Sequence, residues 1–531
     1  MIDLSVLVPA RNEPFLLQTV EDVIAHARAR TEVIVVCDGG WPIDPIPDTP
    51  SVHLVYLPQS IGQRQATNLA ARMARGRFVM KLDAHCAVDE GFDVKLITPY
   101  DTGELTPDTT TIPRMYNLHV FNRHCRACDA VHYQGPLGDG AECPTCKVKG
   151  KMVREMVWTP RFNRMTDFAR FDRRPQFQYW NHYKKRAAAQ GDLADVMCHV
   201  GAGWMMPRSR YWDLGGMDEG HGSWGQMGIE VSCKSWLSGG RQVVNKRTWY
   251  SHLFRTQPGF SFPYKMTEGA AERAREYSRR LWFDNTWPGQ VRPLSWIIRK
   301  FHPVPEWETE EWPEPTLGAV YFTDNQLDPG LMARCQRQLV EALQGRPLVA
   351  VSRAPIDLGT NIVVPGERGR LQMFKQVLAG LEALETDYAF LVEHDCLYPK
   401  EHFDFIPPRR DRFYYDQNVW RVSVADGRAV TYTMMSVSGC VADRQLLVRY
   451  YRDLVADVEK NGYDHKRGYE AGVREGLALG YRAKKPYVDI RHGKNLTASR
   501  WHPDQFHDKR TCQDWREADT VPGWGPLDLG A

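Results

Sequence analysis

The sequence lacks a long hydrophobic run and a strong excess of either charge. No stretch of roughly 18 apolar residues, the length that crosses a bilayer as a helix, occurs in it. The formal net charge is +3, so bulk charge does not mark the whole chain as a polyanion binder. A leader with charged and apolar regions is also lacking at the N-terminus, and we therefore expect a cytoplasmic protein without a membrane span.

The chain does have the length and composition of an ordinary globular protein. Its 531 residues are 43% hydrophobic and 25% charged. A chain of this length is expected to form two or three domains, each large enough to bury its own core.

Short apolar segments alternate with a helical pattern in the N-terminal part. Strands are predicted at residues 4–10, 33–36, 52–57 and 78–82. Between the third and the fourth, Ala66, Leu69, Ala70 and Met73 repeat at the spacing of one helix face. This alternation predicts an α/β fold with a mostly parallel sheet, which binds ligands at the carboxyl ends of its strands.

The motif Asp83-Ala84-His85 follows the last of these strands. Side chains two residues apart in an extended chain share a face, so Asp83 and His85 are predicted to converge. A carboxylate and an imidazole suit Mn²⁺ or a similar ion, which can clamp the diphosphate of a nucleotide-sugar. The alternative is an acidic strand end followed by a histidine that is satisfied within the core.

The segments VLVPARNE, VIVVCDGG and LDAHC resemble the nucleotide-sugar half of a family-2-type glycosyltransferase. That half has the GT-A fold, the Rossmann-like fold of nucleotide-diphospho-sugar transferases. The motifs are similar to those of polypeptide N-acetylgalactosaminyltransferases, which also use an Asp-x-His metal motif. A second block, from Gly201 to Arg255, follows the acceptor-side segment of that family, so the resemblance covers about residues 1–290.

The resemblance implies transfer of a sugar from a nucleotide diphosphate, with a UDP-sugar favoured, to a hydroxyl group. It implies Mn²⁺ or Mg²⁺ as the cofactor, with Asp83, His85 and His252 as metal ligands. The residues implied to bind the nucleotide-sugar are Pro9, Arg11, Glu13, Asp38, Gly62, Arg64, Gly203 and Trp224.

The chain departs from that family in one acceptor-side segment. Where the family reads Trp-Gly-Gly-Glu-Asn-x-Glu, Met227 replaces the first glutamate and only Glu230 remains. Glu230 is the candidate general base, with Asp218 close in sequence. A retaining reaction needs no such base, so the stereochemical outcome stays open. The alternative for Glu230 is a carboxylate in a structural ion pair.

Four of the twelve cysteines form a regular pair of knuckles. Cys125 and Cys128 are separated by two residues, as are Cys143 and Cys146. Four thiolates at this spacing predict one structural Zn²⁺ with all positions filled. The alternatives are scattered free thiols, or disulfides in a secreted protein.

A basic and aromatic stretch follows the knuckles within an expected insertion at residues 118–186. Residues 147–186 contain twelve Lys or Arg against three acids, interleaved with aromatic residues. Such a stretch suits a nucleic-acid backbone and its bases. It equally suits stacking on a sugar acceptor, or an insertion that packs its aromatic residues on the sheet.

The first domain is predicted to span residues 1–300, followed by a Pro- and Glu-rich linker at 301–315. From residue 316 to 531 the order of strand, loop, helix, strand and acid repeats, which predicts a second GT-A-like domain. Its expected metal ligands are Glu393, Asp395 and His492. Arg370 is the expected nucleotide contact and Glu470 the expected acceptor-side carboxylate.

We therefore predict a metal-dependent glycosyltransferase with two tandem GT-A-like domains and a zinc-knuckle insertion in the first. Both domains are expected to be active, on a polysaccharide, protein or DNA acceptor. The first alternative is a phage-type DNA glycosyltransferase that acts on a hydroxylated base. The second is one active domain joined to a non-catalytic sugar-binding domain.

Overall fold

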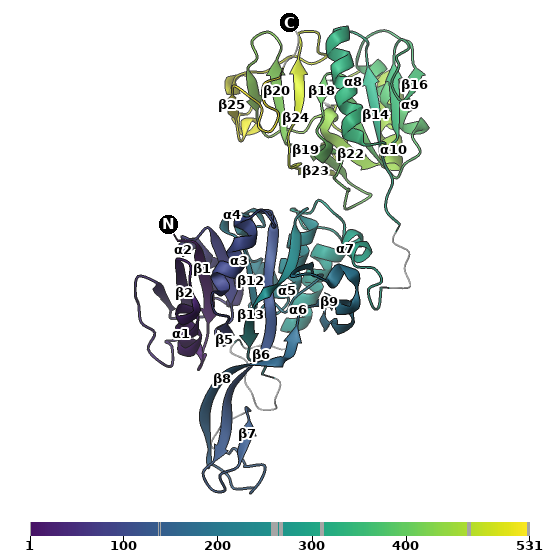
Figure 1. Ribbon diagram of the computed structural model, residues 1–531. Helices are drawn as coiled ribbons and strands as arrows, with labels where there is room; N and C mark the ends of the chain where they lie inside the picture. The colour runs from purple at the N-terminus through teal and green to yellow at the C-terminus, as the bar shows by residue number, and fades with distance from the viewer. Residues whose placement is uncertain are drawn as a thin grey trace. The chain divides into compact units, whose positions relative to one another are not determined.

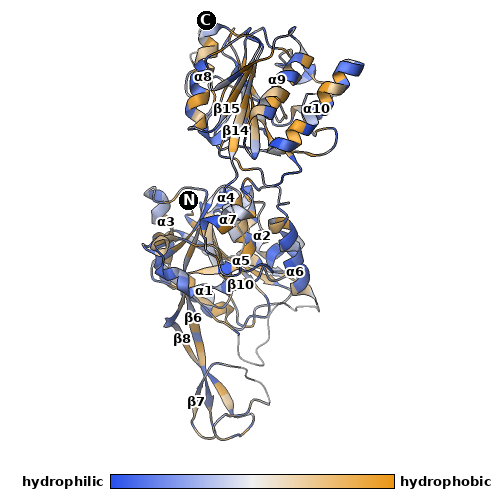
Figure 2. Ribbon diagram, turned by 90° about the vertical axis from the view of Figure 1, so that its right-hand side faces the viewer, coloured by the Kyte–Doolittle hydropathy of each residue, from blue (hydrophilic) through white to orange (hydrophobic). Residues whose placement is uncertain are grey.

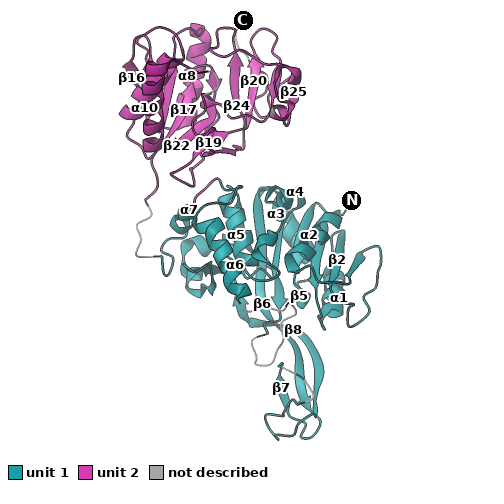
Figure 3. Ribbon diagram, turned by 180° about the vertical axis from the view of Figure 1, so that it is seen from behind, with its two compact units in different colours: residues 1–290, 294–312 teal, residues 291–293, 313–531 magenta. Residues whose placement is uncertain are grey.

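The computed structural model describes residues 2–135, 137, 140–255, 264, 269–307, 313–464 and 469–527. The chain divides into two compact units, residues 1–290 with 294–312 and residues 291–293 with 313–531 (Figure 3). Residues 308–312 of the predicted linker lie outside the described ranges. Among the helices described, none has both the length and the apolar character needed to cross a bilayer.

The first unit is built on one mixed sheet with helices on both faces (Figure 1). The strands of this sheet are β1 (Leu4–Ala10), β2 (Thr31–Asp38), β3 (Val52–Leu57), β4 (Phe78–Leu82), β5 (Cys86–Val88), β6 (Thr109–Cys125), β7 (Val131–Tyr133), β8 (Met152–Thr166), β11 (Leu193–Asp195), β12 (Gly203–Pro207) and β13 (Arg241–His252). Two more strands, β9 (Ala169–Phe171) and β10 (Phe177–Tyr179), pair with each other as a separate sheet. Its helices are α1 (Leu16–His26), α2 (Gln63–Met73), α3 (Phe92–Asp101), α4 (Arg208–Asp213), α5 (Met227–Leu237), α6 (Ala270–Ser278) and α7 (Leu294–Lys300).

The strand order of this sheet is β11-β13-β6-β12-β4-β1-β2-β3. Strands β1 to β4 run parallel, and β12 enters antiparallel between β4 and β6. Every residue of β1 and β2 is buried, as expected for parallel strands that are covered on both faces. Leu7 and Ile34 pack with Ala66 of α2, whereas Val6 and Val33 belong to the core cluster that contains Val20 of α1.

A long hairpin, called the arm below, extends from this sheet (Figure 1). It comprises residues 118–166, which include the distal part of β6, together with β7 and β8. Two register shifts in the β6–β8 ladder, at Tyr116/Asn117 and at His119/Phe121, mark irregularities that bend and twist paired strands. The arm is anchored where Phe15 stacks on Phe121, with ring centroids 5.9 Å apart.

The second unit contains a seven-stranded sheet and a smaller five-stranded one. Its strands are β14 (Leu317–Thr323), β15 (Leu348–Ser352), β16 (Thr360–Val363), β17 (Tyr388–Glu393), β18 (Cys396–Leu397), β19 (Phe413–Asp416), β20 (Val419–Ser423), β21 (Ala429–Thr431), β22 (Cys440–Asp443), β23 (Ala478–Tyr481), β24 (Tyr487–Arg491) and β25 (Arg516–Ala518). Its helices are α8 (Pro329–Leu343), α9 (Arg370–Ala383) and α10 (Arg444–Asn461), along which hydrophobic and hydrophilic residues alternate (Figure 2).

The large sheet of the second unit repeats the sheet of the first. Its order, β16-β15-β14-β17-β22-β19-β23, matches β3-β2-β1-β4-β12-β6-β13 strand for strand. The parallel and antiparallel pairings also correspond, including the parallel pair at the end, β6 with β13 and β19 with β23. The two units differ in the length of the segment that joins the sixth strand of this order to the fifth. Residues 126–202 join β6 to β12, but only residues 417–439 join β19 to β22. The predicted α/β fold class is confirmed.

Candidate functional site

The first candidate site lies at the carboxyl end of β4. Asp83 follows that strand, His85 lies in the turn leading to β5, and His252 ends β13. The end of β13 pairs with β5, which places His252 opposite Cys86. His252 Nε2 lies 3.2 Å from Asp83 Oδ2 and 3.0 Å from His85 Nε2. The turn, not an extended strand as the sequence argument assumed, brings Asp83 and His85 together.

The chemistry of this cluster fits a divalent cation. Burial lowers the pKa of His252 to about 4, so its imidazole is neutral at neutral pH. Burial alone would raise the pKa of Asp83, but Lys81, His252 and His85 outweigh it and hold that pKa below its ordinary value. Oxygen and imidazole donors within 4.8 Å of one another suit Mn²⁺. In addition, the buried Nδ1 of His252 makes no hydrogen bond with the part of the chain that the structure describes.

Glu13 contacts Nδ1 of His85, the ring nitrogen that does not face His252. Its Oε2 lies 2.9 Å from His85 Nδ1 and also pairs with Arg255, while its Oε1 accepts a hydrogen bond from the Phe15 amide. When Nδ1 donates to Glu13, the lone pair of Nε2 is left to face His252. The resemblance implied that Glu13 binds the nucleotide-sugar. The structure instead buries it as the partner of a metal-type ligand.

Lys81 is a site residue that the sequence argument missed. It is 1% exposed, and its Nζ donates to Asp83 and to the Gly201 carbonyl at 3.0 Å. Gln63 Nε2 donates to the same carboxylate oxygen, Asp83 Oδ1, at 3.1 Å. These contacts use Oδ1 of Asp83 as their acceptor, and Oδ2 of Asp83 faces His252. The only signal in the sequence is a lysine inside the apolar segment FVMKL.

Asp38, at the end of β2, organises the loop that leads to α2. Its carboxylate accepts hydrogen bonds from Ser60 Oγ at 2.8 Å, from the Ile61 amide at 2.6 Å and from the Gly62 amide at 2.9 Å. Arg11 donates to the Asp38 carbonyl at 3.4 Å. These residues of the implied nucleotide site therefore shape the loop at the carboxyl end of the sheet.

Three further residues of the implied nucleotide site lie in separate segments. Pro9 is within β1, Gly203 begins β12, and Trp224 lies in the loop before α5. Gly203 is in close contact with the ring of Tyr250: a Cβ at this position would lie 3.1 Å from that ring.

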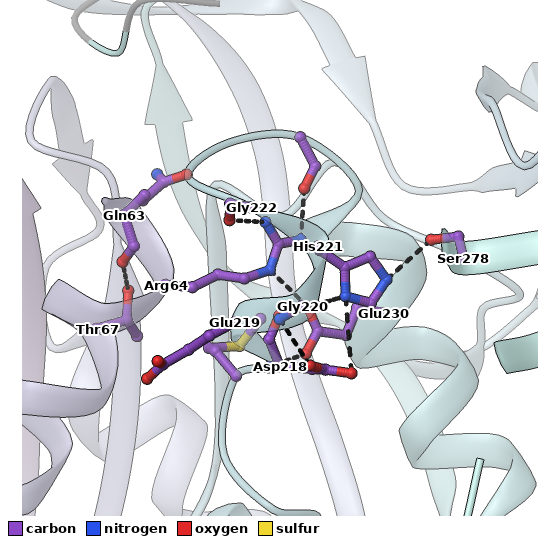
Figure 4. Close-up of polar contacts among 12 residues, drawn as sticks. Gln63, Arg64, Thr67, Asp218, Glu219, Gly220, His221, Gly222, Glu230 and Ser278 are labelled. Atoms are coloured by element: carbon purple, nitrogen blue, oxygen red, sulfur yellow. Dashed lines mark hydrogen bonds and ion pairs between the residues drawn. The ribbon is translucent and has the colours of Figure 1, made fainter. Parts of the chain in front are cut away.

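Arg64 and Glu230 form a buried ion pair instead of lining a nucleotide or acceptor site (Figure 4). Arg64 Nε donates to Glu230 Oε2 at 2.9 Å, and Lys234 Nζ donates to Glu230 Oε1 at 2.9 Å. The exposed fraction of Glu230 is 0% and that of Arg64 is 1%. Burial by itself raises the pKa of Glu230, but Lys234, Arg64 and His221 outweigh it and lower the pKa to about 2.

This network fixes the loop before α5, so Glu230 takes the structural alternative that the sequence left open. The Asp218 amide donates to Glu230 Oε1 at 2.5 Å, and Arg64 also donates to the Gly222 carbonyl at 3.2 Å. The Asp218 carboxylate accepts from the Tyr277 hydroxyl at 3.1 Å. A base must reach the acceptor hydroxyl, and the fully buried Glu230 carboxylate has no path to one.

The four knuckle cysteines meet at the far end of the arm. Cys125 Sγ lies 3.7 Å from Cys146 Sγ, and Cys128 Sγ lies 3.8 Å from Cys143 Sγ. Four thiolates about 2.3 Å from one tetrahedral zinc lie about 3.8 Å apart, so the set fits that ion. His132 Nε2 lies 3.7 Å from Cys143 Sγ at the edge of the cluster.

The second unit has its own cluster at the carboxyl end of β17. Ligand atoms of His394, Asp395 and His492 lie within 4.8 Å of one another, as do those of Glu393, Asp395 and Cys396. His492 Nε2 is 3.3 Å from Asp395 Oδ2. His394, which the sequence argument passed over, therefore joins the predicted set.

Strand register corrects the predicted correspondence between the two clusters. Cys396 pairs with Asp489, as Cys86 pairs with His252 in the first unit. Asp489, not the predicted His492, therefore occupies the position of His252. Asp83 and His85 lie three residues and one residue before Cys86, and Glu393 and Asp395 lie three residues and one residue before Cys396. Glu393 and Asp395 therefore occupy the positions of Asp83 and His85.

A pocket of about 740 Å³ opens beside this second cluster. Arg370, the first residue of α9, lines it and lies over the Tyr463 ring at 4.7 Å. Glu470 lines it too, and burial raises the pKa of that carboxyl. Arg421 is 6% exposed, and its NH1 makes no hydrogen bond with any described residue.

Comparisons with known proteins match part of this chain. Residues 5–117 match the family model "Glycosyl transferase family 2". Polypeptide N-acetylgalactosaminyltransferase 10 of Homo sapiens is 23% identical over an alignment of 301 positions that covers 53% of this chain and 42% of that protein. The Mus musculus protein of the same name is 24% identical with the same coverage. The chain thus spans less than half the length of these relatives.

The solved structures that are similar to this chain include the following two. GalNAc-T7 with UDP, GalNAc and Mn²⁺ has a TM-score of 0.38 and 16% identity, covering 57% of this chain and 55% of that one. S. aureus TarS 1-349 in complex with UDP has a TM-score of 0.28 and 14% identity, covering 48% and 61%.

Proposed function

We propose that the first unit transfers a sugar from a nucleotide diphosphate to a hydroxyl acceptor, on the premise that residues 5–117 match the glycosyl transferase family 2 model. The observation that carries the proposal is the cluster of Asp83, His85 and His252 at the carboxyl end of β4. A family 2 domain supplies the transferase class, and the cluster supplies a place for a divalent cation. UDP-sugars are the favoured donors.

Asp83, His85 and His252 would hold Mn²⁺ or Mg²⁺. When bound, such an ion supplies neutralisation of the charge that develops on the departing diphosphate. The chain's own residues supply the fixed geometry: Lys81 orients Asp83, and Glu13 orients His85. Orientation of this kind lowers the entropic part of the barrier.

No carboxylate of the Arg64–Glu230 network acts as a base in this proposal. The low pKa of Glu230 makes it a poor proton acceptor at neutral pH, and its burial separates it from an acceptor. The buried ion pairs of the network instead fix the loop that carries Trp224. This assignment favours a reaction that does not depend on a base from α5.

We extend the proposal to a second transferase site in the second unit, so that the protein is bifunctional. The repeated sheet topology and the cluster of His394, Asp395 and His492 at the equivalent strand end support it. The large pocket offers room for a nucleotide-sugar. A non-catalytic sugar-binding role for this unit is the outcome that the test below separates.

The cysteines support two further proposals, a structural zinc ion and a reducing compartment. The geometry of the knuckle thiolates supports a structural Zn²⁺ in the arm. All twelve cysteines are free thiols, which supports a reducing compartment such as the cytoplasm.

The test is Mn²⁺-dependent release of nucleotide from a panel of UDP-, GDP- and dTDP-sugars. Asp83→Asn and Asp395→Asn are compared with Asp101→Asn, which removes an exposed carboxylate of α3. We expect each site variant to lose release for one donor, at least a hundredfold given the loss of a metal ligand, and Asp101→Asn to match the wild type.

Release that is unchanged in Asp83→Asn and insensitive to EDTA would contradict the metal assignment in the first unit. Loss in Asp83→Asn alone, with two Mn²⁺ still bound per wild-type chain, would make the second unit a binding domain.

A further inference from the structure

Strand β8 places uncompensated cations beside the candidate site of the first unit. Arg161 and Arg164 line a cavity of about 200 Å³, together with residues that include Tyr133 and Phe254. The Phe254 ring lies 4.6 Å from the ring of His252, so the cavity neighbours the metal-type cluster. No carboxylate of the described residues forms a salt bridge with Arg161 or Arg164.

This cavity is separate from the metal-type cluster. None of its lining residues is Asp83, His85 or His252. Arg161 lies over the Tyr133 ring, 4.9 Å from its centroid, which orients the guanidinium without neutralising it. A cavity with two unneutralised guanidinium groups favours an anion, and phosphate is the anion whose geometry guanidinium matches best.

The cations continue along the arm. Residues 147–164 contain six Lys or Arg against Glu155 alone. Lys149 and Lys151 are exposed and precede β8, in the segment that carries the knuckle cysteines, so they are accounted for as solvated surface charges without any ligand. That explanation does not extend to arginines gathered in a cavity next to the cluster.

An exposed aromatic residue lies between the two arginines. Phe162 is 59% exposed, although it makes T-shaped contacts with Tyr116 and Trp249 at ring distances of 5.1 and 5.7 Å. Cationic grooves with exposed aromatic rings bind single-stranded nucleic acids, because cations contact the phosphates and rings stack on unpaired bases.

We infer that the arm is the acceptor-binding surface and that the acceptor is single-stranded nucleic acid. A backbone phosphate occupies the cavity of Arg161 and Arg164, a base stacks on Phe162, and the lysines of the arm follow the next phosphates. The inference rests on the proposed function, because only a transferase has an acceptor. Binding to the arm, however, is measured independently of transfer.

The experiment measures binding of a fluorescein-labelled oligothymidylate to the full chain by anisotropy over a range of salt concentrations. In Arg161→Gln/Arg164→Gln, the slope of log K against log salt is expected to fall by about 0.7, the contribution of the one phosphate that both arginines contact. Phe162→Ala is expected to weaken binding roughly tenfold through loss of one stacked base. Arg161→Lys/Arg164→Lys keeps both charges and should keep the slope.

The matched control is Lys184→Gln/Lys185→Gln, which removes two exposed positive charges outside the arm. The control is expected to leave the slope unchanged. An equal fall in slope in the control, or no salt-dependent binding in the wild type, would overturn the inference. Tighter binding of duplex DNA, or equal binding of heparin with no effect of Phe162→Ala, would also overturn it.

Oligouridylate in place of oligothymidylate distinguishes RNA from DNA as the source of the strand, and binding of either supports the inference. Asp83→Asn separates the two proposals, because it is expected to abolish nucleotide release and to retain oligonucleotide binding. Binding without any wild-type nucleotide release would therefore contradict the transferase proposal and leave the arm assignment standing.

Discussion

Among single residues, Glu13 makes two contacts through one carboxylate oxygen, with His85 on one side and Arg255 on the other. Removing it leaves His85 free to rotate and leaves a buried guanidinium without this partner. Residues that orient metal ligands in this way typically change metal affinity about 10- to 100-fold when they are replaced.

We therefore expect Glu13→Gln to weaken Mn²⁺ binding by about 10- to 100-fold, measured by titrating free Mn²⁺ with electron paramagnetic resonance. Glu21→Gln, at an exposed position on α1, is the control and should bind Mn²⁺ as the wild type does. Normal Mn²⁺ affinity with weakened UDP binding would instead return Glu13 to a direct nucleotide contact.

Sequence predicted the site best where spacing carries the information. Asp83 and His85 lie close together because only one residue separates them, whatever the backbone does between. Glu13 and His85 are 72 residues apart, so their contact depends on the packing of the sheet. Lys81 is buried only because Asp83 and the Gly201 carbonyl meet its ammonium group, and no local pattern announces that pairing.

At the scale of elements, the stability of the arm depends on the cysteine cluster at its far end. The ends of β6 and β8 enclose the segment that carries all four knuckle cysteines, and little apolar core surrounds them. A hairpin of this kind is marginally stable alone, and closed zinc sites supply folding energy directly.

We expect Cys143→Ser to lower the zinc content from one ion per chain toward zero and to make residues 118–166 sensitive to trypsin. Zinc is measured by atomic absorption and cleavage by mass spectrometry. Cys512→Ser, a free thiol in the second unit, is the control. Full zinc content with an intact arm in Cys143→Ser would contradict the four-cysteine site.

The predicted strands at residues 4–10 and 52–57 coincide with β1 and β3, because short, mostly apolar segments have few alternatives. The arm was expected only as an insertion. Buried and partly exposed residues do not alternate cleanly along β6, and its pairing with β8 shifts register twice. These irregularities remove the period of two by which a long strand is recognised.

At the scale of the whole molecule, each unit has hydrophobic clusters of its own. The Arg64–Glu230 pair lies within the first unit, and breaking a buried pair on one side costs about 3–5 kcal/mol because a charge is left uncompensated. The folded-state pKa of Glu230 is about 2, below its ordinary value of 4.5. Its stabilising contribution is therefore complete above pH 4.5 and is lost as the pH falls toward 2.

We expect Glu230→Gln to destabilise the first unit by about 3–5 kcal/mol at neutral pH and to leave the second unit unchanged. Hydrogen exchange followed by mass spectrometry reports both units in one sample. The wild type should approach the variant as the pH falls below 4.5. Glu276→Gln, in an exposed pair on α6, is the control. Equal loss of protection in both units would show that they do not unfold separately.

The duplication itself was predicted from the recurring order of strand, loop, helix, strand and acid. The equivalence of Asp489 with His252 was not, because it depends on which residue of β24 faces Cys396 across the pair. A shift of register changes that partner without changing the pattern of the sequence.

The crossover between β6 and β12 has a practical consequence for protein engineering. The same two positions of a repeated sheet carry residues 126–202 in one unit and residues 417–439 in the other, while the flanking strands keep their order. Corresponding strands of the two units are thus already joined by segments of very different length. This connection is therefore suited to the exchange of whole segments, with the flanking strands left in their order.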